Sequence, residues 1–583
     1  MTCCQYDIVC VIRSCILQDK FYFRESENQY MKNIVLKVHP KDNVIVALRN
    51  LEADEEIHFD NQVYKILQPV EAKHKFYTED IAMGGAVTMY GVLVGKVTMD
   101  VKRGGLMTTA NLHHAADPYA YRGVQYQWTA PDVSKWKDRT FMGYHRSDGR
   151  VGTANYWLFI PTVFCENRNL DVIREAMHNE LGYAVTEKYK AFTRALVEGY
   201  KHEAQGMRHE GGGNSQAQGT RHEGGGTRIF KNVDGIKFLN HQGGCGGTRQ
   251  DSAILENLLA AYADHPNVGG ITILSLGCQH LQLDAFVETI KNRNPQFDKP
   301  ILTFEQQAGR TEEELIQDAI RETFQGLIEI NKQERKPAPL DKMTVGVKCG
   351  GSDGFSGISA NPAVGYFSDL LVALQGKILL AEFPELCGAE QELIDRSTSQ
   401  TTAEKFISLM DAYSAQAEQV GSGFHMNPSP GNIRDGLITD AIKSAGACKK
   451  GGTSPVVDVL DYTEPATKPG LSLVCTPGND VEATTGKAAS GATLILFTTG
   501  LGTPTGNPVC PTIKLATNSK LARKMADIID IDCGPIVEGE KTIEEMGEEI
   551  LEYCIKAASG EVVPKAVQLN QDDFIPWKRG VSL

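Results

Sequence analysis

The spacing of hydrophobic and polar positions changes near residue 140 and divides the chain into two parts. Between residues 34 and 101 the apolar stretches are short, separated by tight turns and mostly alternate with polar positions, which is typical of β-strands. Beyond residue 140, short wholly apolar runs are followed by longer stretches whose apolar residues recur at helical spacing. Such alternation predicts parallel sheets that are covered by helices.

The chain is therefore predicted to be an α/β protein, with a small β domain followed by two α/β units that contain mainly parallel sheets. The predicted regions are an N-terminal appendage at 1–30, the small β domain at 31–101, a linker at 102–139, a second domain at 140–335 and a C-terminal domain at 336–583. Within the second domain, the insert 201–228 contains the sequence Arg-His-Glu-Gly-Gly-Gly twice. Its glycine triplets predict a mobile surface loop rather than a metal site.

Composition and charge exclude several classes of protein. A chain of 583 residues with 41% hydrophobic residues can bury several cores, and its net charge of −14 argues against nucleic acid as a partner. The apolar runs are too short to cross a membrane, so no membrane partner is expected. The 14 cysteines lie mainly in or beside glycine-rich turns, which fits a reducing cytoplasm better than a disulfide framework.

Small polar residues collect where the predicted strands end. The stretch 348–365 combines glycine with cysteine, serine and aspartate, between an apolar run at 343–347 and a helical pattern at 366–374. Similar loops follow at 240–251, 276–280, 427–432, 476–480 and 498–506. Open α/β sheets bind ligands at the carboxyl ends of their strands, so these loops predict one shared site for a polyhydroxylated, anionic small molecule. The expected substrate contacts are Cys349, Ser352, Asp353, Ser356, Asn427, Ser429, Asn432 and Thr503.

The same loops resemble the signature of the altronate and galactarate dehydratases. The motifs are Cys349-Gly-Gly-Ser-Asp-Gly with Ser356-Gly-Ile-Ser-Ala-Asn-Pro, Asn427-Pro-Ser-Pro-Gly-Asn, Gly152-Thr-Ala-Asn155, Leu276-Gly-Cys278 and the loop 499–504. The resemblance covers about residues 32–583, and the segments 164–169 and 382–390 look more like the altronate branch. It implies that the small domain is a β-clip (SAF-like) domain. It also implies a hydro-lyase that converts D-altronate to 2-dehydro-3-deoxy-D-gluconate and water in hexuronate breakdown.

The resemblance further implies a divalent metal, Fe²⁺ or Mn²⁺, with Mg²⁺ as another candidate, and a histidine in each of two N-terminal motifs. These histidines are His39 and His74, which we expect to face the larger domain as metal ligands or acid/base groups. Lys75 would hold the substrate carboxylate. Glu166 would be a further metal ligand, or a charge that complements a helix N-terminus. Glu382 and Glu385 flank a Phe-Pro turn after a predicted strand, a suitable place for a carboxylate base or ligand, and Glu385 is the catalytic candidate.

Several alternatives stay open from the sequence. The substrate could be galactarate or another aldarate. Because Ala154 and Leu501 stand where the resemblance leads us to expect arginine, the chain could also be a sugar-acid-binding protein without catalysis. The β-clip domain could serve only to dock a partner, and we expect a homo-oligomer. Finally, Cys245, Cys278 and Cys349 each end a strand-like run and could hold an iron–sulfur cluster, although the close Cys-x-x-Cys spacing is absent.

Overall fold

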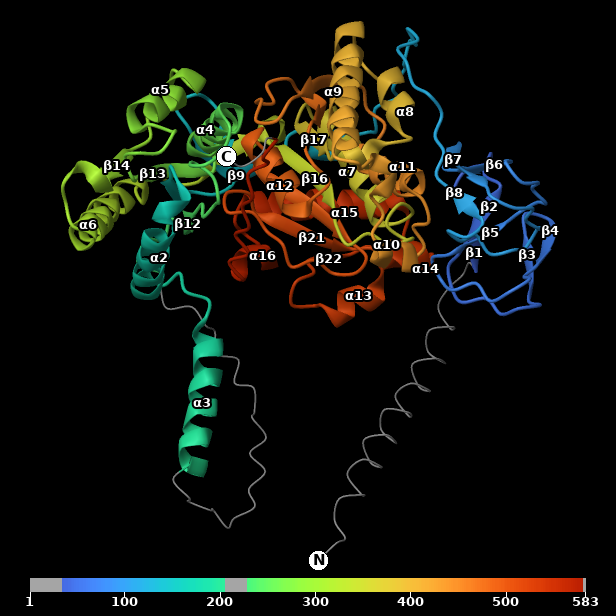
Figure 1. Cartoon of the computed structure of the whole chain (residues 1–583), viewed down its shortest axis with the longest axis horizontal. Helices are drawn as coiled ribbons and strands as arrows, with labels where there is room; N and C mark the ends of the chain where they lie inside the picture. Colours follow the sequence, from blue (N-terminus) through green and yellow to red (C-terminus); the bar gives the residue numbers. More distant parts are fainter. Residues whose placement is uncertain (1–33, 205–227, 580–583) are drawn as a thin grey trace, which may run out of the picture.

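Figure 1 shows the computed structural model of the chain, in which residues 34–204 and 228–579 are described. The predicted appendage at 1–30 and nearly all of the predicted insert at 201–228 lie outside these ranges. A small β domain is followed by two α/β units with parallel sheets, which confirms the predicted fold class. Among the described residues, no helix is both long and apolar enough to cross a membrane. The cytoplasmic location stays a prediction.

The small domain is built from short antiparallel strands. Its sheets are β1 (Val35–Leu36), β2 (Val44–Ala47) and β5 (Lys75–Tyr77); β3 (Glu56–Phe59) and β4 (Gln62–Lys65); and β6 (Ala86–Met89), β7 (Val92–Val97) and β8 (Leu112–His113). Asp60 and Asn61 both have positive φ, as a two-residue hairpin turn between β3 and β4 requires. Because β8 pairs with β7, the sheet extends past the predicted boundary at residue 101 into the predicted linker.

The second domain contains a four-stranded parallel sheet in the order β12-β11-β13-β14. Its strands are β11 (Tyr156–Pro161), β12 (Gly235–Phe238), β13 (Val268–Ser275) and β14 (Ile301–Glu305). Its helices are α2 (Asn167–Leu181), α3 (Glu187–Ala204), α4 (Arg249–Asp264), α5 (Leu283–Arg293) and α6 (Glu312–Ile330). Gly270 and Gly326 leave room for the fully buried indole of Trp157, since a β-carbon at either position would collide with it. The absent side chains thus let α6 lie close to the sheet.

The chain enters and leaves the second domain through adjacent strands. The antiparallel sheet β10-β9-β15 joins β9 (Thr140–His145) and β10 (Val151–Gly152) to β15 (Lys336–Pro339). The sequence predicts a domain boundary at residue 335. The residues that follow it form β15, which pairs with β9 at the start of the second domain.

The C-terminal domain contains a seven-stranded parallel sheet in the order β18-β19-β17-β16-β20-β21-β22. The strands are β16 (Thr344–Cys349), β17 (Lys377–Ala381), β18 (Val456–Leu460), β19 (Gly470–Val474), β20 (Leu494–Thr499), β21 (Thr512–Ala516) and β22 (Ile531–Asp532). From β16 the chain first builds one side of the sheet and then returns to build the other side from β20. The strand order therefore reverses between β16 and β20, and the carboxyl ends of these two strands are where such sheets bind ligands.

Helices cover both faces of this sheet. The α-helices of the domain are α7 (Ala360–Ala373), α8 (Glu390–Asp395), α9 (Gln400–Gln419), α10 (Pro430–Arg434), α11 (Asp440–Cys448), α12 (Asp480–Ala489), α13 (Ser519–Lys524), α14 (Gly534–Glu538), α15 (Ile543–Ala558) and α16 (Lys565–Gln568). One face packs against α7, α9 and α15. The other face packs against α12 together with α4 and α5, so one hydrophobic core is shared by the two α/β domains.

His265 lies fully buried at this shared interface and makes the contact sensitive to acid. Its Nε2 donates to Ala492 O (2.8 Å), and its Nδ1 accepts from the N–H of Asn267 (3.1 Å), so the imidazole is neutral. Burial lowers the pKa of His265 to about 3, although the Ala492 carbonyl opposes the shift. A histidine in the unfolded chain has a pKa of about 6.5.

We therefore expect acid to destabilise the protein through His265. Because its folded pKa is depressed, its contribution is fully present above pH ~6.5 and is lost as the pH falls toward 3. Urea denaturation of His265→Gln, which retains a side-chain N–H donor, should show a flatter pH dependence across this window than the wild type. Parallel curves for the two proteins would show that His265 does not carry the acid sensitivity.

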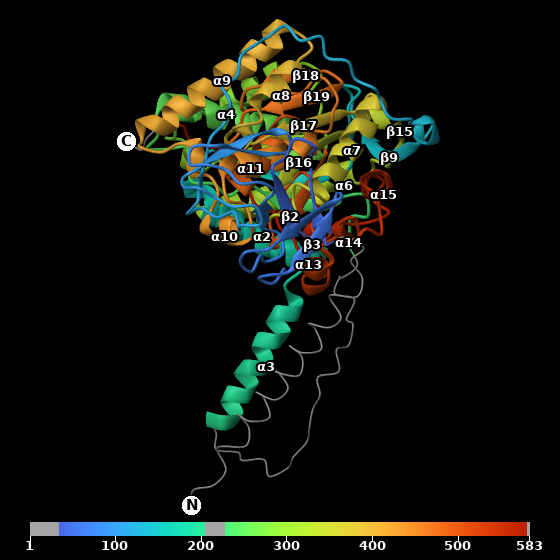
Figure 2. The ribbon, with the colours of Figure 1, turned by 90° about the vertical axis from the view of Figure 1, so that its right-hand side faces the viewer.

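The small domain packs against the C-terminal domain near the strand-order reversal. Tyr90 and Met89 share a hydrophobic cluster with Phe355, Ile358 and Leu437. Figure 2 shows the small domain in front of the C-terminal domain, and strand β7 of the small domain contacts α11.

Candidate active site

The carboxyl ends of β16, β17 and β19 bring together an unusual set of buried charged side chains. Lys348 and Cys349 end β16, and Glu382 and Glu385 follow β17 in the short helix η5 (Phe383–Leu386). Around them lie three more lysines from α11, η7 (Lys449–Gly451) and α12, namely Lys443, Lys450 and Lys487. No lysine side chain of this group is more than 9% exposed. We call these seven residues, with Asp480, the lysine–carboxylate cluster.

Each acidic group of the cluster contacts a lysine. The Lys348 ammonium contacts the Glu382 carboxylate and lies 3.0 Å from Asp480 Oδ1. Lys443 Nζ lies 2.9 Å from Glu385 Oε1. These pairs explain how so much charge is retained in the interior, because buried ions persist only when they are paired.

The remaining two lysines complete the cluster. Lys450 Nζ donates to Cys349 Sγ (2.8 Å) and lies 3.6 Å from Glu382 Oε2. Lys487 Nζ lies 3.8 Å from the same oxygen. Four ammonium groups thus face the three carboxylates of Glu382, Glu385 and Asp480. Burial raises the pKa of the neighbouring Asp440 well above its usual range and keeps this group uncharged, so one positive charge is in excess. A buried site of this kind attracts a small anion such as a carboxylate.

The buried environment changes the protonation of several members. Burial by itself would raise the pKa of Glu385, but Lys443, Lys348 and Lys450 lower it to about 2, so this carboxylate is ionised. Burial raises the pKa of the Cys349 thiol despite Lys450, which keeps the sulfur protonated. Burial lowers the pKa of Lys487 to about 8, although Glu382 opposes the shift.

Polar atoms without hydrogen bonds are concentrated here. Five of the ten buried side-chain atoms that lack a hydrogen bond within the described residues lie in or beside the cluster: Glu382 Oε2, Lys487 Nζ, Asn427 Nδ2, Ser352 Oγ and Asp440 Oδ2. A buried polar atom without a partner costs about 1–3 kcal/mol. Their concentration at one place indicates that a polar ligand supplies the missing partners.

The backbone at Glu382 is also unusual. This residue has φ of 75°, in the left-handed region that side chains other than glycine rarely adopt. Its N–H donates to Thr476 Oγ1 (3.1 Å), which follows β19. Strained backbone persists where the surroundings hold it, and such residues gather at functional sites. The strain directs the Glu382 carboxylate toward the lysines.

The small domain reaches this region through two lysines. Lys73 Nζ lies 3.0 Å from Asp353 Oδ2 and 2.9 Å from Asp435 Oδ1. Lys75, which is fully buried, donates to Gly436 O (2.6 Å), and burial lowers its pKa to about 7 although Asp353 opposes the shift. A side chain at Gly436, where φ is also positive, would collide with the Lys73 backbone. The small domain is thus fitted closely onto the loops after β16 and before α11.

The predicted ligands His39, His74 and Glu166 do not come together. His39 is half-buried and its Nδ1 accepts from the N–H of Lys41 (3.2 Å), within its own loop. His74 Nδ1 is buried without a hydrogen bond, and burial lowers the pKa of this imidazole. Glu166 lies at the start of α2 in the second domain, where its Oε2 accepts from Asn169 Nδ2 (2.8 Å) and burial raises its pKa.

Several predicted substrate contacts serve to hold the loops. Ser429 and Asn432 form a capping box at α10, and Asn432 Nδ2 also donates to Ser352 O (2.8 Å). Ser356 Oγ donates to Asp353 Oδ1 (3.0 Å). The backbone carbonyl of Thr503 accepts from Lys514 Nζ (2.7 Å). These side chains shape the walls of the site.

Cys349, Glu385, Ser352 and Asn427 are the predicted residues that the structure places at the cluster. Asn427 is half-buried, and its Oδ1 accepts from Lys443 Nζ (2.8 Å). The adjacent His425 is exposed, so this segment lies between solvent and the cluster.

The sequence interpretation included Glu382 and Glu385 but missed all four lysines of the cluster. The burial of Lys348 could have been predicted from the sequence, because a lysine that directly continues an apolar run is a buried charge that needs a partner. The burial of Lys487 is less evident from the sequence, although its neighbours in α12 are alanines, threonines and a glycine. Nothing in the sequence around Lys443 and Lys450 predicts that these two lysines are buried.

Cys349, Glu382 and Glu385 also have the spacing of metal ligands. They form the one group of three or more such residues, within the described ranges, whose ligand atoms all lie within 4.8 Å of one another. The group does not suit a divalent cation in this arrangement, however. Glu382 and Glu385 are paired with ammonium groups, the Cys349 thiol accepts from Lys450, and the cluster already carries an excess positive charge. Adding two more charges would require buried lysines to lose protons.

A cavity lies elsewhere in the molecule and suits an acidic ligand poorly. It has a volume of about 730 Å³, lies between α2 and the segment after α16, and contains none of the predicted site residues. Four carboxylates and two cationic side chains line it: Asp171, Glu175, Asp572, Asp573, Arg174 and Lys190. Because acidic groups predominate, a sugar acid would be repelled there and attracted to the lysine–carboxylate cluster.

A parallel sheet with buried lysines and a carboxylate at its strand-order reversal defines an enzyme that acts on a small anionic substrate. Comparison with family models identifies the family of enzymes to which the chain belongs. Residues 340–582 match the C-terminal domain of D-galactarate/altronate dehydratase, residues 143–331 match the second domain of D-galactarate dehydratase/altronate hydrolase, and residues 33–115 match the altronate/galactarate dehydratase SAF domain. The chain belongs to the altronate/galactarate dehydratase family and is a sugar-acid dehydratase, a hydro-lyase.

Curated relatives agree over nearly the whole chain. Altronate dehydratase of Escherichia coli (strain K12) is 33% identical over 553 residues, covering 94% of this chain and 99% of that protein. Altronate dehydratase of Bacillus subtilis (strain 168) is 31% identical over 560 residues, covering 95% and 100%. Galactarate dehydratase (L-threo-forming) of Escherichia coli (strain K12) is 28% identical over 529 residues, covering 90% and 93%.

Proposed function

We propose that the protein converts D-altronate to 2-dehydro-3-deoxy-D-gluconate and water at the lysine–carboxylate cluster, as a step of hexuronate catabolism. The observation that carries this proposal is the coincidence, at the carboxyl ends of β16, β17 and β19, of an excess positive charge, an ionised carboxylate and five polar atoms without a hydrogen bond. A polyhydroxylated acid would satisfy both the charge and the hydrogen-bonding capacity. The two altronate dehydratases among the relatives support the choice of substrate.

The chemistry required is removal of a weakly acidic proton from C2, followed by loss of the C3 hydroxyl. Glu385 takes the C2 proton in this scheme. While the Lys443 ammonium contacts Glu385, the low pKa of this carboxylate makes it a weak base. A substrate carboxylate that pairs with Lys443 raises the pKa of Glu385 and makes it a stronger base. The enediolate that forms carries extra negative charge, which the buried ammonium groups stabilise strongly because water is excluded.

Departure of the hydroxyl needs a proton donor. Lys450 is suitably placed, because its ammonium donates to Cys349 Sγ, a weak acceptor that a substrate oxygen could replace. Loss of water from C3 leaves an enol, which takes a proton at C3 and becomes the 2-keto-3-deoxy acid. The proton that Glu385 takes from C2 replaces the one that Lys450 gives to the leaving hydroxyl. The enol hydroxyl loses a proton as C3 gains one, so the net loss is one water.

Charge favours an aldonate over an aldarate. The cluster has one ammonium more than it has carboxylates, which matches the single charge of altronate. Galactarate carries two carboxylates and would need a further cationic partner. It is the second candidate because a galactarate dehydratase is also among the relatives. A sugar-acid-binding protein without turnover is the third, on the grounds of Ala154 and Leu501.

A panel assay tests the proposal. Purified protein is incubated with altronate, mannonate, gluconate, galactonate, galactarate and glucarate, with Fe²⁺, Mn²⁺ or Mg²⁺ added or with a chelator, and 2-keto-3-deoxy acid is measured. We expect turnover of altronate. Loss of turnover with chelator would show the metal dependence that the resemblance implies, while binding of altronate without turnover would support the binding protein instead.

A further inference from the structure

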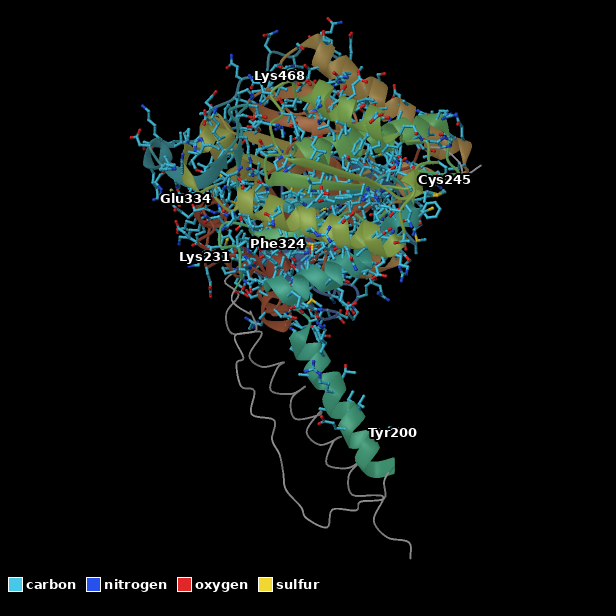
Figure 3. All side chains as sticks on the ribbon, turned by 90° about the vertical axis from the view of Figure 1, so that its left-hand side faces the viewer. Tyr200, Lys231, Cys245, Phe324, Glu334 and Lys468 are labelled. Atoms are coloured by element: carbon cyan, nitrogen blue, oxygen red, sulfur yellow. The ribbon has the colours of Figure 1, made fainter. Side chains whose placement is uncertain are left out.

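Three exposed cysteines lie along one edge of the second domain. Cys165 lies in the short helix η2 (Phe164–Glu166) after β11, Cys245 follows β12 and Cys278 follows β13. These strands are neighbours in the order β12-β11-β13 and run parallel, so all three cysteines lie at the same, carboxyl edge. Figure 3 labels Cys245 at the rim of the body.

Their loops are bound to one another. The N–H of Phe164 donates to Gly243 O (3.1 Å), and the N–H of His280 donates to Gly244 O (3.3 Å). Gly244 has φ of 98° and lies so close to the backbone of residues 162 and 163 that a β-carbon would collide with it. The Cys245 loop is therefore held between the loops that carry the other two thiols.

Exposure distinguishes these cysteines from the rest. Among the described residues, the other cysteines are all buried or half-buried, and Cys165, Cys245 and Cys278 are the exposed ones. Cysteine is among the residue types most often buried, so three exposed thiols at one sheet edge call for a specific reason. Cys278 Sγ already accepts a hydrogen bond from Gln307 Nε2 (3.4 Å).

The distances between the three thiols indicate which kind of metal group they could bind. They do not form a group with all ligand atoms within 4.8 Å of one another. A single zinc-like ion with Zn–S bonds of about 2.3 Å would need sulfurs closer than that. An iron–sulfur cluster is wider, since each thiolate holds a different iron atom.

We propose that Cys165, Cys245 and Cys278 bind an iron–sulfur cluster in which one iron lacks a cysteine ligand and faces solvent. The sequence pattern had suggested Cys349 as the third thiol. The structure places Cys349 in the C-terminal sheet, bonded to Lys450, and puts Cys165 beside the other two loops. The proposal does not depend on altronate being the substrate.

Metal content and spectroscopy test this site without reference to activity. Protein purified without oxygen, or reconstituted with iron and sulfide, should contain about four iron atoms and four sulfides per chain and show broad visible absorbance. Replacing Cys165, Cys245 or Cys278 by serine should reduce iron and sulfide several-fold, and the triple variant should lose both. Because all three side chains are exposed, these variants should fold normally by circular dichroism.

Cys554→Ala, at a buried cysteine of α15, is the control and should keep full iron and sulfide. Retention of sulfide by the triple serine variant would overturn the proposal. So would one tightly bound zinc per chain in place of iron and sulfide, or an absence of both after reconstitution.

Discussion

Replacement of Glu385 by glutamine is expected to lower turnover of the sugar acid by a factor of about 10²–10⁴. Glutamine keeps the size of the side chain and can still accept a hydrogen bond from Lys443, but it cannot take a proton from C2. The loss should appear in kcat, because the group acts on the reacting carbon rather than on binding alone. Formation of 2-keto-3-deoxy acid is the measurement.

Glu552→Gln is the matched control, since Glu552 bonds Trp136 and Arg139 at a distance from the cluster. Its turnover should match that of the wild type. If Glu385→Gln also kept wild-type turnover, Glu385 would have no part in proton transfer and the reaction would have to be placed elsewhere.

The second large effect is expected on stability. Lys348→Met should lower the free energy of unfolding by about 3 kcal/mol, because it leaves the fully buried Glu382 without its closest cation. Lys450 and Lys487 lie 3.6 and 3.8 Å from Glu382 and should keep the loss near the lower end of the range for broken buried pairs. Urea denaturation followed by fluorescence and by circular dichroism would measure it.

A double-mutant cycle shows whether the pair itself is responsible. Adding Glu382→Gln removes the stranded charge, so the double variant should be more stable than the sum of the two single losses predicts. Strict additivity would mean that Lys348 stabilises the domain through packing or through Asp480, and not through Glu382.

The sequence predicted the location of the site better than its chemistry. Strand ends can be recognised from short apolar runs, so the loop with Cys349 and Ser352 and the turn with Glu385 are each predicted to follow a strand. The predicted loops 240–251 and 276–280 instead follow strands of the four-stranded sheet in the second domain. The order of the seven strands, which brings β16 beside both β17 and β20, depends on long-range packing that periodicity does not record.

The lysines could not be predicted because their proximity also depends on long-range packing. Lys443, Lys450 and Lys487 lie on α11, η7 and α12, and they meet only because these elements pack over the ends of three strands. A lysine on a helix is usually a solvated charge, so nothing local distinguishes these three from the many on the surface.

The two histidines illustrate the limits of a resemblance. His39 and His74 stand in the expected motifs, and their domain packs against the C-terminal domain. Lys73, Lys75 and the carbonyl of Val94 make polar contacts across that interface. Glu166 belongs to another sheet and holds Asn169. Whether these residues act in catalysis stays a prediction, and His39→Ala and His74→Ala are the variants that test it.

The location of the bound substrate is the decisive measurement. A crystal structure of Glu385→Gln soaked with D-altronate should show the acid in the lysine–carboxylate cluster, with its carboxylate against Lys443 and Lys487 and C2 facing residue 385. Density for the acid in the cavity lined by Arg174 and Asp572, with the cluster unchanged, would contradict the assignment of the active site.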